Sequence, residues 1–146
     1  MSGKNPLTGA WQLERWEIAY GDGRAPGYPY GADASGLLVY TDDGHMSAVI
    51  ARAGRGRLSS ASVRSAPEGE RLAAFESYFH YAGRYEIDHG AGCVTHRVTH
   101  ALNPNFVGSE QRRDMALDGD LLTLSASDTI PGSDISRHHR LIWRRA

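Results

Sequence analysis

The chain has 146 residues, of which 40% are hydrophobic and 23% are charged, and its formal net charge at pH 7 is -1. This length and composition fit one globular domain over residues 1–146, and they exclude a disordered or fibrous chain. The nearly balanced charge gives no broad electrostatic basis for holding nucleic acid or an anionic membrane. We therefore expect neither as a partner.

The N-terminal residues and the cysteine content bear on the cellular compartment. Residues 1–10 contain no apolar stretch and a single basic residue, Lys4, which argues against a secretory signal. Cys93 is the only cysteine, so an internal disulfide is excluded. No apolar run is long enough to cross a bilayer as a helix. We expect a cytoplasmic protein.

Short segments rich in β-forming residues recur between turn signals, which favours antiparallel sheet. In chain order, the expected strands are residues 11–20, 37–41, 45–52, 83–88, 93–100, 110–117, 121–125 and 136–144. Turns with glycine at residues 42–44, 89–92 and 118–120 join neighbouring strands as hairpins. Eight strands linked in this way predict an all-β, up-and-down antiparallel barrel.

One segment departs from the strand pattern. Ser65-Ala66-Pro67-Glu68 has the form of a capping box with proline in the first turn, and Leu72, Phe75 and Phe79 follow at helical spacing. We therefore expect one short helix over residues 66–80. Two positions for this helix are open: it can cover one mouth of the barrel or pack on the outer wall.

Alternation along the strand over residues 93–100 predicts that one face points into the barrel. This face carries Val94, His96, Val98 and His100. His96 and His100 are therefore expected inside the barrel or at its rim. The two histidines lie about 13 Å apart along a strand, too far to bind one metal ion together. We expect no metal site and no cofactor.

The strands over residues 110–117 and 136–144 add further inward candidates. Their more apolar faces carry Gln111, Arg113, Met115 and Leu117, and His139, Leu141 and Trp143. An inward Arg113 is costly without a partner, so it needs a buried carboxylate or an anionic or hydrogen-bond-accepting ligand group. No inner-face acid is evident nearby. Both a ligand and a structural network of water and backbone carbonyls remain open as partners of Arg113.

Several tyrosines offer the flat apolar surface and the hydroxyl group that a ligand pocket uses, although core packing accounts for some of them equally well: Tyr28, Tyr30, Tyr40, Tyr78, Tyr81 and Tyr85. Of these we assign Tyr40 and Tyr85 to the candidate site. Signatures of other chemistries are missing, since the chain has no nucleophile elbow, no phosphate-binding glycine loop and no cysteine pair. Serine hydrolases and nucleotide enzymes are thereby disfavoured.

A set of motifs in chain order resembles the bacterial and fungal lipocalin-like domain family. Gly9-Ala10-Trp11 is similar to the Gly-x-Trp start of lipocalins, and the other motifs are Tyr28-Pro29-Tyr30-Gly31, residues 36–47, Tyr81-Ala82-Gly83-Arg84-Tyr85, Val94-Thr95-His96 and residues 103–108. The resemblance covers nearly the whole chain, and it implies an eight-stranded barrel with a central cavity.

The same resemblance places three side chains at polar positions of the family pattern, namely His96, Asn103 and Arg113. Arg112 stands where that pattern has an apolar residue, which leaves open whether Arg112 or Arg113 faces the cavity. The resemblance does not separate passive carriers from enzymes that cyclise or isomerise a small molecule.

Three functions fit these observations. The first is binding of a small, partly apolar organic molecule in the barrel, and the candidate ligand-binding residues are Arg113, Gln111, Asn103, Tyr40, Tyr85, His139 and Trp143. The second is a cyclase or isomerase in which His96 acts as acid or base, because imidazole titrates near neutrality, while Arg113 stabilises developing negative charge. The third is a partner-binding module with a filled barrel. The sequence indicates neither the ligand nor an oligomeric state.

Overall fold

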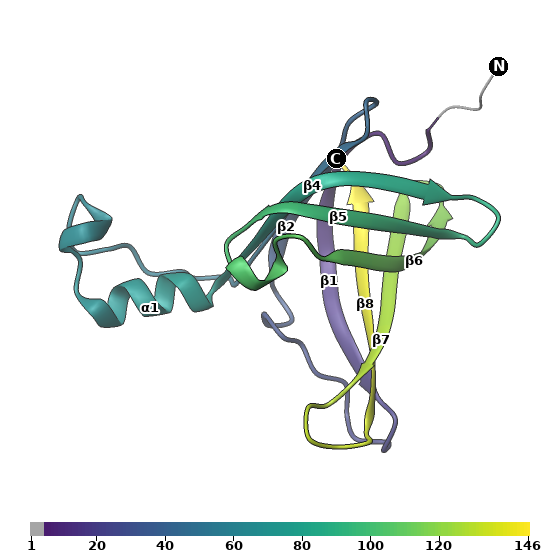
Figure 1. The fold of residues 1–146 in the computed structure, drawn as a ribbon. Coiled ribbons are helices and arrows are strands. Elements are labelled where there is room, and N and C mark those ends of the chain that lie inside the picture. The colour runs from purple at the N-terminus through teal and green to yellow at the C-terminus, as the bar shows by residue number, and fades with distance from the viewer. Residues whose placement is uncertain (1–4) are drawn as a thin grey trace.

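The computed structural model describes residues 5–146. These residues form eight strands: β1 (Gly9–Tyr20), β2 (Ser35–Tyr40), β3 (His45–Ala51), β4 (Tyr78–Asp88), β5 (Cys93–Ala101), β6 (Glu110–Asp118), β7 (Leu121–Thr129) and β8 (Ser136–Arg145). Each strand pairs antiparallel with the next, and β8 pairs with β1 to close the barrel (Figure 1). The predicted all-β barrel is confirmed.

The turns between sequential strands depend on glycine, as the sequence predicts. Gly44, Gly92 and Gly119 have φ angles of 91°, 66° and 59°. Residues with a side chain rarely adopt this left-handed conformation, whereas glycine does so at little cost. The short turns keep consecutive strands adjacent, so the barrel closes without a crossover connection.

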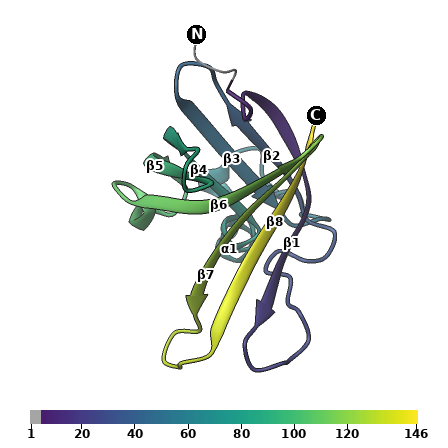
Figure 2. The same cartoon turned by 90° about the vertical axis from the view of Figure 1, so that its right-hand side faces the viewer.

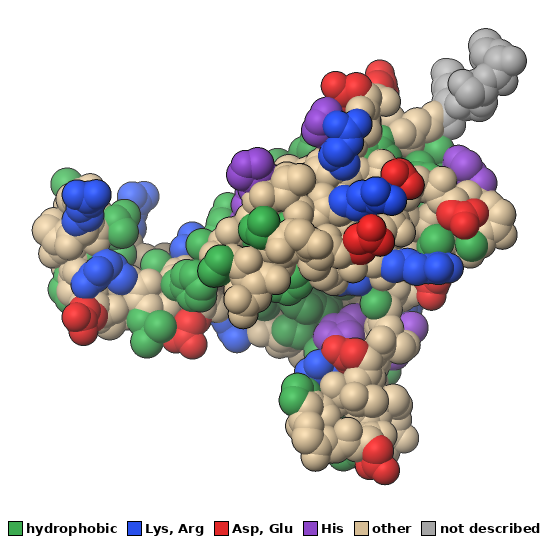
Figure 3. All heavy atoms as spheres, viewed as in Figure 1, with side chains coloured by type: hydrophobic (Ala, Val, Ile, Leu, Met, Phe, Trp, Pro, Cys, Tyr) green, Lys and Arg blue, Asp and Glu red, His purple; other side chains and the backbone are tan. Residues whose placement is uncertain are grey.

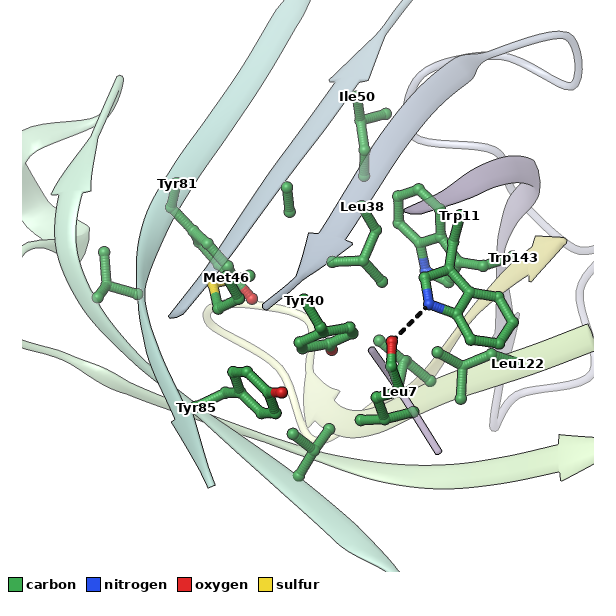
Figure 4. Close-up of a cluster of buried hydrophobic side chains, with 14 of the residues drawn as sticks. Leu7, Trp11, Leu38, Tyr40, Met46, Ile50, Tyr81, Tyr85, Leu122 and Trp143 are labelled. Atoms are coloured by element: carbon green, nitrogen blue, oxygen red, sulfur yellow. Dashed lines mark hydrogen bonds between the residues drawn. The ribbon is translucent and has the colours of Figure 1, made fainter. Parts of the chain in front are cut away.

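The segment before β1 packs across one end of the barrel, where it meets the last residues of β8. Leu7 is fully buried, and the Trp11 indole N–H donates a hydrogen bond to its carbonyl oxygen at 2.9 Å (Figure 4). The Arg145 guanidinium lies 4.1 Å from the centre of the Trp11 ring and donates to the carbonyl oxygens of Pro6 and Thr8. Side chains therefore fill this end, and the Gly-x-Trp motif supplies the central one.

A bulge in β1 lets two tryptophans face inward although one lies at an odd and the other at an even position. The register of β1 against β8 shifts between Leu13 and Arg15. Before the bulge Trp11 points into the core, and after it Trp16 does so. A strand that alternated without interruption would have placed one of these large side chains in solvent.

A second irregularity reverses the alternation in β5. Its register against β4 shifts between Ala82 and Gly83, which leaves Thr99 as an extra residue between paired positions. Thr99 and His100 are consequently both exposed. The expectation that His100 points inward is wrong, because this bulge turns its side chain to the outer surface.

The helix is shorter than expected. It spans α1 (Glu68–Glu76) and follows a 3-10 turn, η1 (Val63–Ser65). The predicted capping box does not form, since Pro67 occupies the N-cap position without a side-chain hydrogen bond. Residues 78–80, expected at the end of the helix, instead open β4 and pair with β3. Cross-strand packing of these aromatic residues outweighs their helical spacing.

The helix takes neither of the two expected positions. It projects away from the barrel beyond the ends of β3 and β4 (Figure 1). Leu72 and Phe75 are 59% and 49% exposed. The loop after β3 holds the helix instead, because Arg55 donates to the Ser77 hydroxyl and the hydroxyl of Ser59 donates to a carboxylate on α1.

The outer surface of β4, β5 and β6 carries charged side chains. Arg97 on β5 forms ion pairs with Glu86 on β4 and Glu110 on β6. Figure 3 shows basic and acidic side chains mixed over this part of the molecule. Among residues 5–146, no helix combines the length and the apolar character needed to cross a membrane.

Gly83 permits the close approach of β4 and β5 at the bulge, so we predict that Gly83→Ala destabilises the barrel. An added Cβ would meet the Arg97 carbonyl oxygen at 1.9 Å, and backbone must shift to relieve the contact. The free energy of unfolding should fall by about 1–3 kcal/mol, the usual cost of overpacking, as measured by urea denaturation. Gly56→Ala, where nothing lies within 4 Å of the added Cβ, is the matched control. Equal stability of the two variants would contradict the prediction.

Candidate functional site

A hollow of about 430 Å³ lies inside the barrel. Most of its wall is apolar and comes from several strands and from η2 (Pro104–Phe106), with Leu38, Ile50, Phe79, Phe106, Leu124 and Trp143 as the main contributors. The Tyr81 ring packs edge to face against Phe79, with ring centres 5.3 Å apart. It packs at a tilt against Phe106, with ring centres 6.0 Å apart. The hollow therefore presents flat apolar surfaces of the kind that bind a partly apolar organic molecule.

Polar side chains gather at two levels of this hollow. Tyr81 and His96 form its inner end, and they are only 5% and 2% exposed. Ser127 and Asp128 on β7 line the hollow from exposed positions, and half-buried His139 on β8 lies beside them. The ends of β1, β7 and β8 extend below the other strands at this side (Figures 1 and 2). We call the second group the mouth.

At the inner end, His96 is hydrogen-bonded through both ring nitrogens. Its Nε2 lies 2.6 Å from the Tyr40 hydroxyl, and its Nδ1 lies 2.7 Å from the Tyr81 hydroxyl. Burial lowers the pKa of His96 to about 3, with a smaller contribution from the charge of Arg113. The imidazole is therefore neutral at pH 7.

The two tyrosines also keep their protons. Burial raises the pKa of Tyr40 well above its ordinary value, and burial raises the pKa of Tyr81 to about 12 even though the nearby charge of Arg113 lowers it. At neutral pH the three side chains thus carry two hydroxyl hydrogens and one imidazole hydrogen between them.

Arg113 adds a positive charge to the hollow. Its Nη1 donates to the Arg112 carbonyl oxygen at 2.9 Å, and its Nη2 lies 3.4 Å from the Gln111 side-chain oxygen. Arg113 makes no ion pair with any residue that the structure describes. Arg112 is exposed, so Arg113 is the arginine of this pair that faces inward. Its remaining N–H groups are available to an acceptor in the hollow.

A separate hydrogen-bond network orients the side chains at the mouth. The Trp16 indole N–H donates to His139 Nδ1 at 3.4 Å, so His139 Nε2 carries the hydrogen that it donates to Asp128 at 3.2 Å. Asp128 also accepts two hydrogen bonds from Arg137, which lower its pKa. Trp16 stacks on Tyr30 with ring centres 5.4 Å apart. These contacts fix the indole ring of Trp16, which lines the hollow.

The structure brings five of the eight residues predicted from sequence to the hollow: His96, Gln111, Arg113, His139 and Trp143. Tyr40 contacts His96 from behind and does not line the hollow, and Tyr85 packs at the filled end and donates to the Thr41 carbonyl oxygen at 2.6 Å. Asn103 lies outside the hollow, where its side chain caps η2. Its effect on the hollow is indirect, because η2 carries Phe106.

A catalytic role for His96 stays a prediction, and the surroundings of the imidazole bear on it. The predicted role needs an imidazole that titrates near neutrality, whereas burial lowers the pKa of His96 to about 3. Both of its nitrogens are also engaged by tyrosine hydroxyls. This setting favours a neutral ring with a hydrogen bond at each nitrogen.

Phe79 and Trp16 were not predicted as lining residues, and Tyr81 was named among the possible pocket tyrosines without being assigned to the site. Phe79 and Tyr81 alternate with inward Gly83 and Tyr85, but this signal is visible only if β4 begins at Tyr78 and the helix ends before it. Trp16 is hidden by the bulge in β1. On β7, the expected strand ended before the residues that form the mouth. Within residues 5–146, no three His, Cys, Asp or Glu side chains gather closely enough to hold a metal ion.

Comparisons with known proteins agree with this geometry. Residues 8–146 match the model of a family described as the lipocalin-like domain. The chain is also similar to a protein of Aspergillus oryzae described as a 4'-hydroxy-3'-methoxypropiophenone carrier protein. The two are 29% identical over 106 residues, which cover 68% of this chain and 96% of the relative.

We predict that His96 makes the fold sensitive to acid. Its ordinary pKa of 6.5 falls to about 3 in the folded protein. Between these pH values the unfolded chain binds a proton that the folded chain excludes, so stability is lost as the pH falls below 6.5. From pH 7 to pH 5 the loss should be about 2 kcal/mol.

Urea denaturation at pH 7 and pH 5 measures this loss. In His96→Gln the decrease in unfolding free energy between the two pH values should be smaller by that amount. His100→Gln replaces an exposed histidine of the same strand and should retain the wild-type decrease. An unchanged decrease in His96→Gln would show that His96 is not buried as a neutral group.

Proposed function

The chain belongs to the lipocalin-like domain family, and on that premise we propose that it binds a small, partly apolar aromatic molecule in the hollow of its barrel. The observation that carries this proposal is the inward guanidinium of Arg113, which has no carboxylate partner among residues 5–146. A charged group in such a setting is stabilised by a ligand that supplies a hydrogen-bond acceptor.

The size and the wall of the hollow support the same proposal. A volume of about 430 Å³ lies in the range of small-molecule sites, of about 300–1,000 Å³. Its aromatic side chains suit a flat ring. The ligand named for the Aspergillus oryzae relative, an aryl ketone, has such a ring together with oxygen acceptors. We extend that chemical class, and not that particular compound, to this chain.

The other two functions have less support. A cyclase or isomerase needs a group that exchanges protons during the reaction, and His96 remains neutral with both nitrogens engaged. A partner-binding module with a filled barrel does not account for the hollow. Carriage or sequestration of a small molecule requires only binding, so it is the function we propose.

We predict that Arg113→Gln weakens binding of an aryl ketone. Loss of a hydrogen bond to a charged group is worth about 1.5–3 kcal/mol, which corresponds to an increase in Kd of about 10- to 100-fold. Isothermal titration calorimetry with 4'-hydroxy-3'-methoxypropiophenone as the probe measures the change. Chromatography of the probe after prolonged incubation shows whether the protein converts it.

Arg112→Gln is the matched control, because it removes the same charge from the neighbouring, exposed position. It should leave the Kd within about twofold of the wild-type value, since an exposed charge contributes little. Equal weakening by both substitutions would indicate a nonspecific effect of charge. Conversion of the probe would favour an enzyme over a carrier.

A further inference from the structure

We propose that Tyr40, His96 and Tyr81 form a hydrogen-bond relay of fixed direction, which makes the inner end of the hollow a subsite for a carbonyl or anionic oxygen. Tyr81 then donates to the ligand, and Tyr40, which does not line the hollow, is a positioning residue. This inference rests on the proposed function, because it specifies the chemistry of the molecule that the hollow binds.

The direction of the relay follows from counting hydrogens. Neutral His96 has one nitrogen that donates and one that accepts, so one tyrosine must donate to it and the other must accept from it. Tyr40 is 1% exposed, and His96 is its only hydrogen-bond partner within residues 5–146. Its hydroxyl hydrogen therefore has to point at His96 Nε2.

The remaining assignments are then determined. With Nε2 accepting from Tyr40, the imidazole hydrogen lies on Nδ1 and is donated to the Tyr81 oxygen. The Tyr81 hydroxyl hydrogen has no acceptor among the described side chains, and Tyr81 lines the hollow. It is consequently free to donate to a bound molecule.

The reverse direction is unfavourable. It would place the imidazole hydrogen on Nε2 and leave the Tyr40 hydroxyl hydrogen buried without an acceptor. A buried polar group that loses its partner costs about 1–3 kcal/mol. The forward direction has no such cost, because the corresponding hydrogen of Tyr81 faces a space that water or a ligand can occupy.

Other polar groups around the inner end are also donors. Arg113 has N–H groups without a partner in the described part of the chain, and the buried Trp143 indole N–H beside the hollow likewise lacks an acceptor there. The nearby acceptor, the Gln111 side-chain oxygen, is occupied by Arg113. An oxygen with lone pairs satisfies this arrangement, whereas an ammonium group would meet donors and the positive charge of Arg113.

The tautomer of His96 can be measured without any ligand. Nitrogen-15 NMR of the labelled protein at pH 7 should show the imidazole hydrogen of His96 on Nδ1. In Tyr40→Phe the Nε2 acceptor loses its donor, so the Nδ1 form should lose population to the Nε2 form. Protonation of Nε2 in the wild-type protein would overturn the relay.

Ligand selectivity tests the subsite with three probes of one shape: propiophenone, propylbenzene and 1-phenylpropylamine, titrated by calorimetry. The wild-type protein should bind the ketone about tenfold more tightly than the hydrocarbon, the value of one good hydrogen bond, and should bind the amine most weakly. Tyr81→Phe should abolish most of the preference for the ketone. Tyr40→Phe should reduce it as well, although Tyr40 does not line the hollow.

Tyr85→Phe is the control, because it removes another buried tyrosine hydroxyl that lies outside the relay. It should keep the wild-type ratio of affinities even if it lowers stability. Equal affinity of the wild-type protein for ketone and hydrocarbon would overturn the oxygen subsite but leave binding in the hollow intact. Failure of all three probes to bind would instead contradict the proposed function, together with the subsite that rests on it.

Discussion

The His96 imidazole is hydrogen-bonded through both nitrogens in the interior of the barrel, to Tyr40 on β2 and to Tyr81 on β4. A buried polar ring without these partners would be strongly destabilising. The three side chains join three strands at the level where the packed core ends and the hollow begins. The polarity of the hollow depends on these hydrogen bonds. Because the imidazole donates to the Tyr81 oxygen, the Tyr81 hydroxyl hydrogen points into the hollow as a donor.

The two ends of the barrel differ because the chain fills only one of them. Leu7 and Trp11 close the end where β1 begins and β8 ends, and Arg145 covers the tryptophan ring. Eight strands leave an interior that side chains can fill or that can hold one small ligand. In this protein the interior does both at different levels. The unpaired charge of Arg113 then lies in the part that remains open.

The barrel was predictable from the sequence because its signals are local. Glycine turns mark where one strand ends and the next begins, and alternating apolar residues mark the strands themselves. Where the connections are short, consecutive strands are neighbours in the sheet. Arg113 and Gln111 were predictable for the same reason, since burial alternates along β6 from Glu110 to Ala116. The alternation does not extend to Leu117, which was expected on the inner face but is 42% exposed near the end of the strand. His100 and Trp16 were not, because a bulge reverses alternation and one sequence gives no sign of its position. Tyr81 was a possible pocket tyrosine that could not be assigned, because helical spacing and strand pairing compete at residues 78–80, and only the pairing with β3 resolves them.

The central claim is that a small aromatic molecule with an oxygen acceptor occupies the hollow, and amide chemical-shift mapping tests it most directly. On titration with 4'-hydroxy-3'-methoxypropiophenone, saturable shifts should appear at residues around the hollow, such as Leu38, Tyr81, Gln111 and Leu124. Residues of α1 should not respond, because none of them lines the hollow. Shifts confined to α1, or no saturable shifts around the hollow, would contradict the claim.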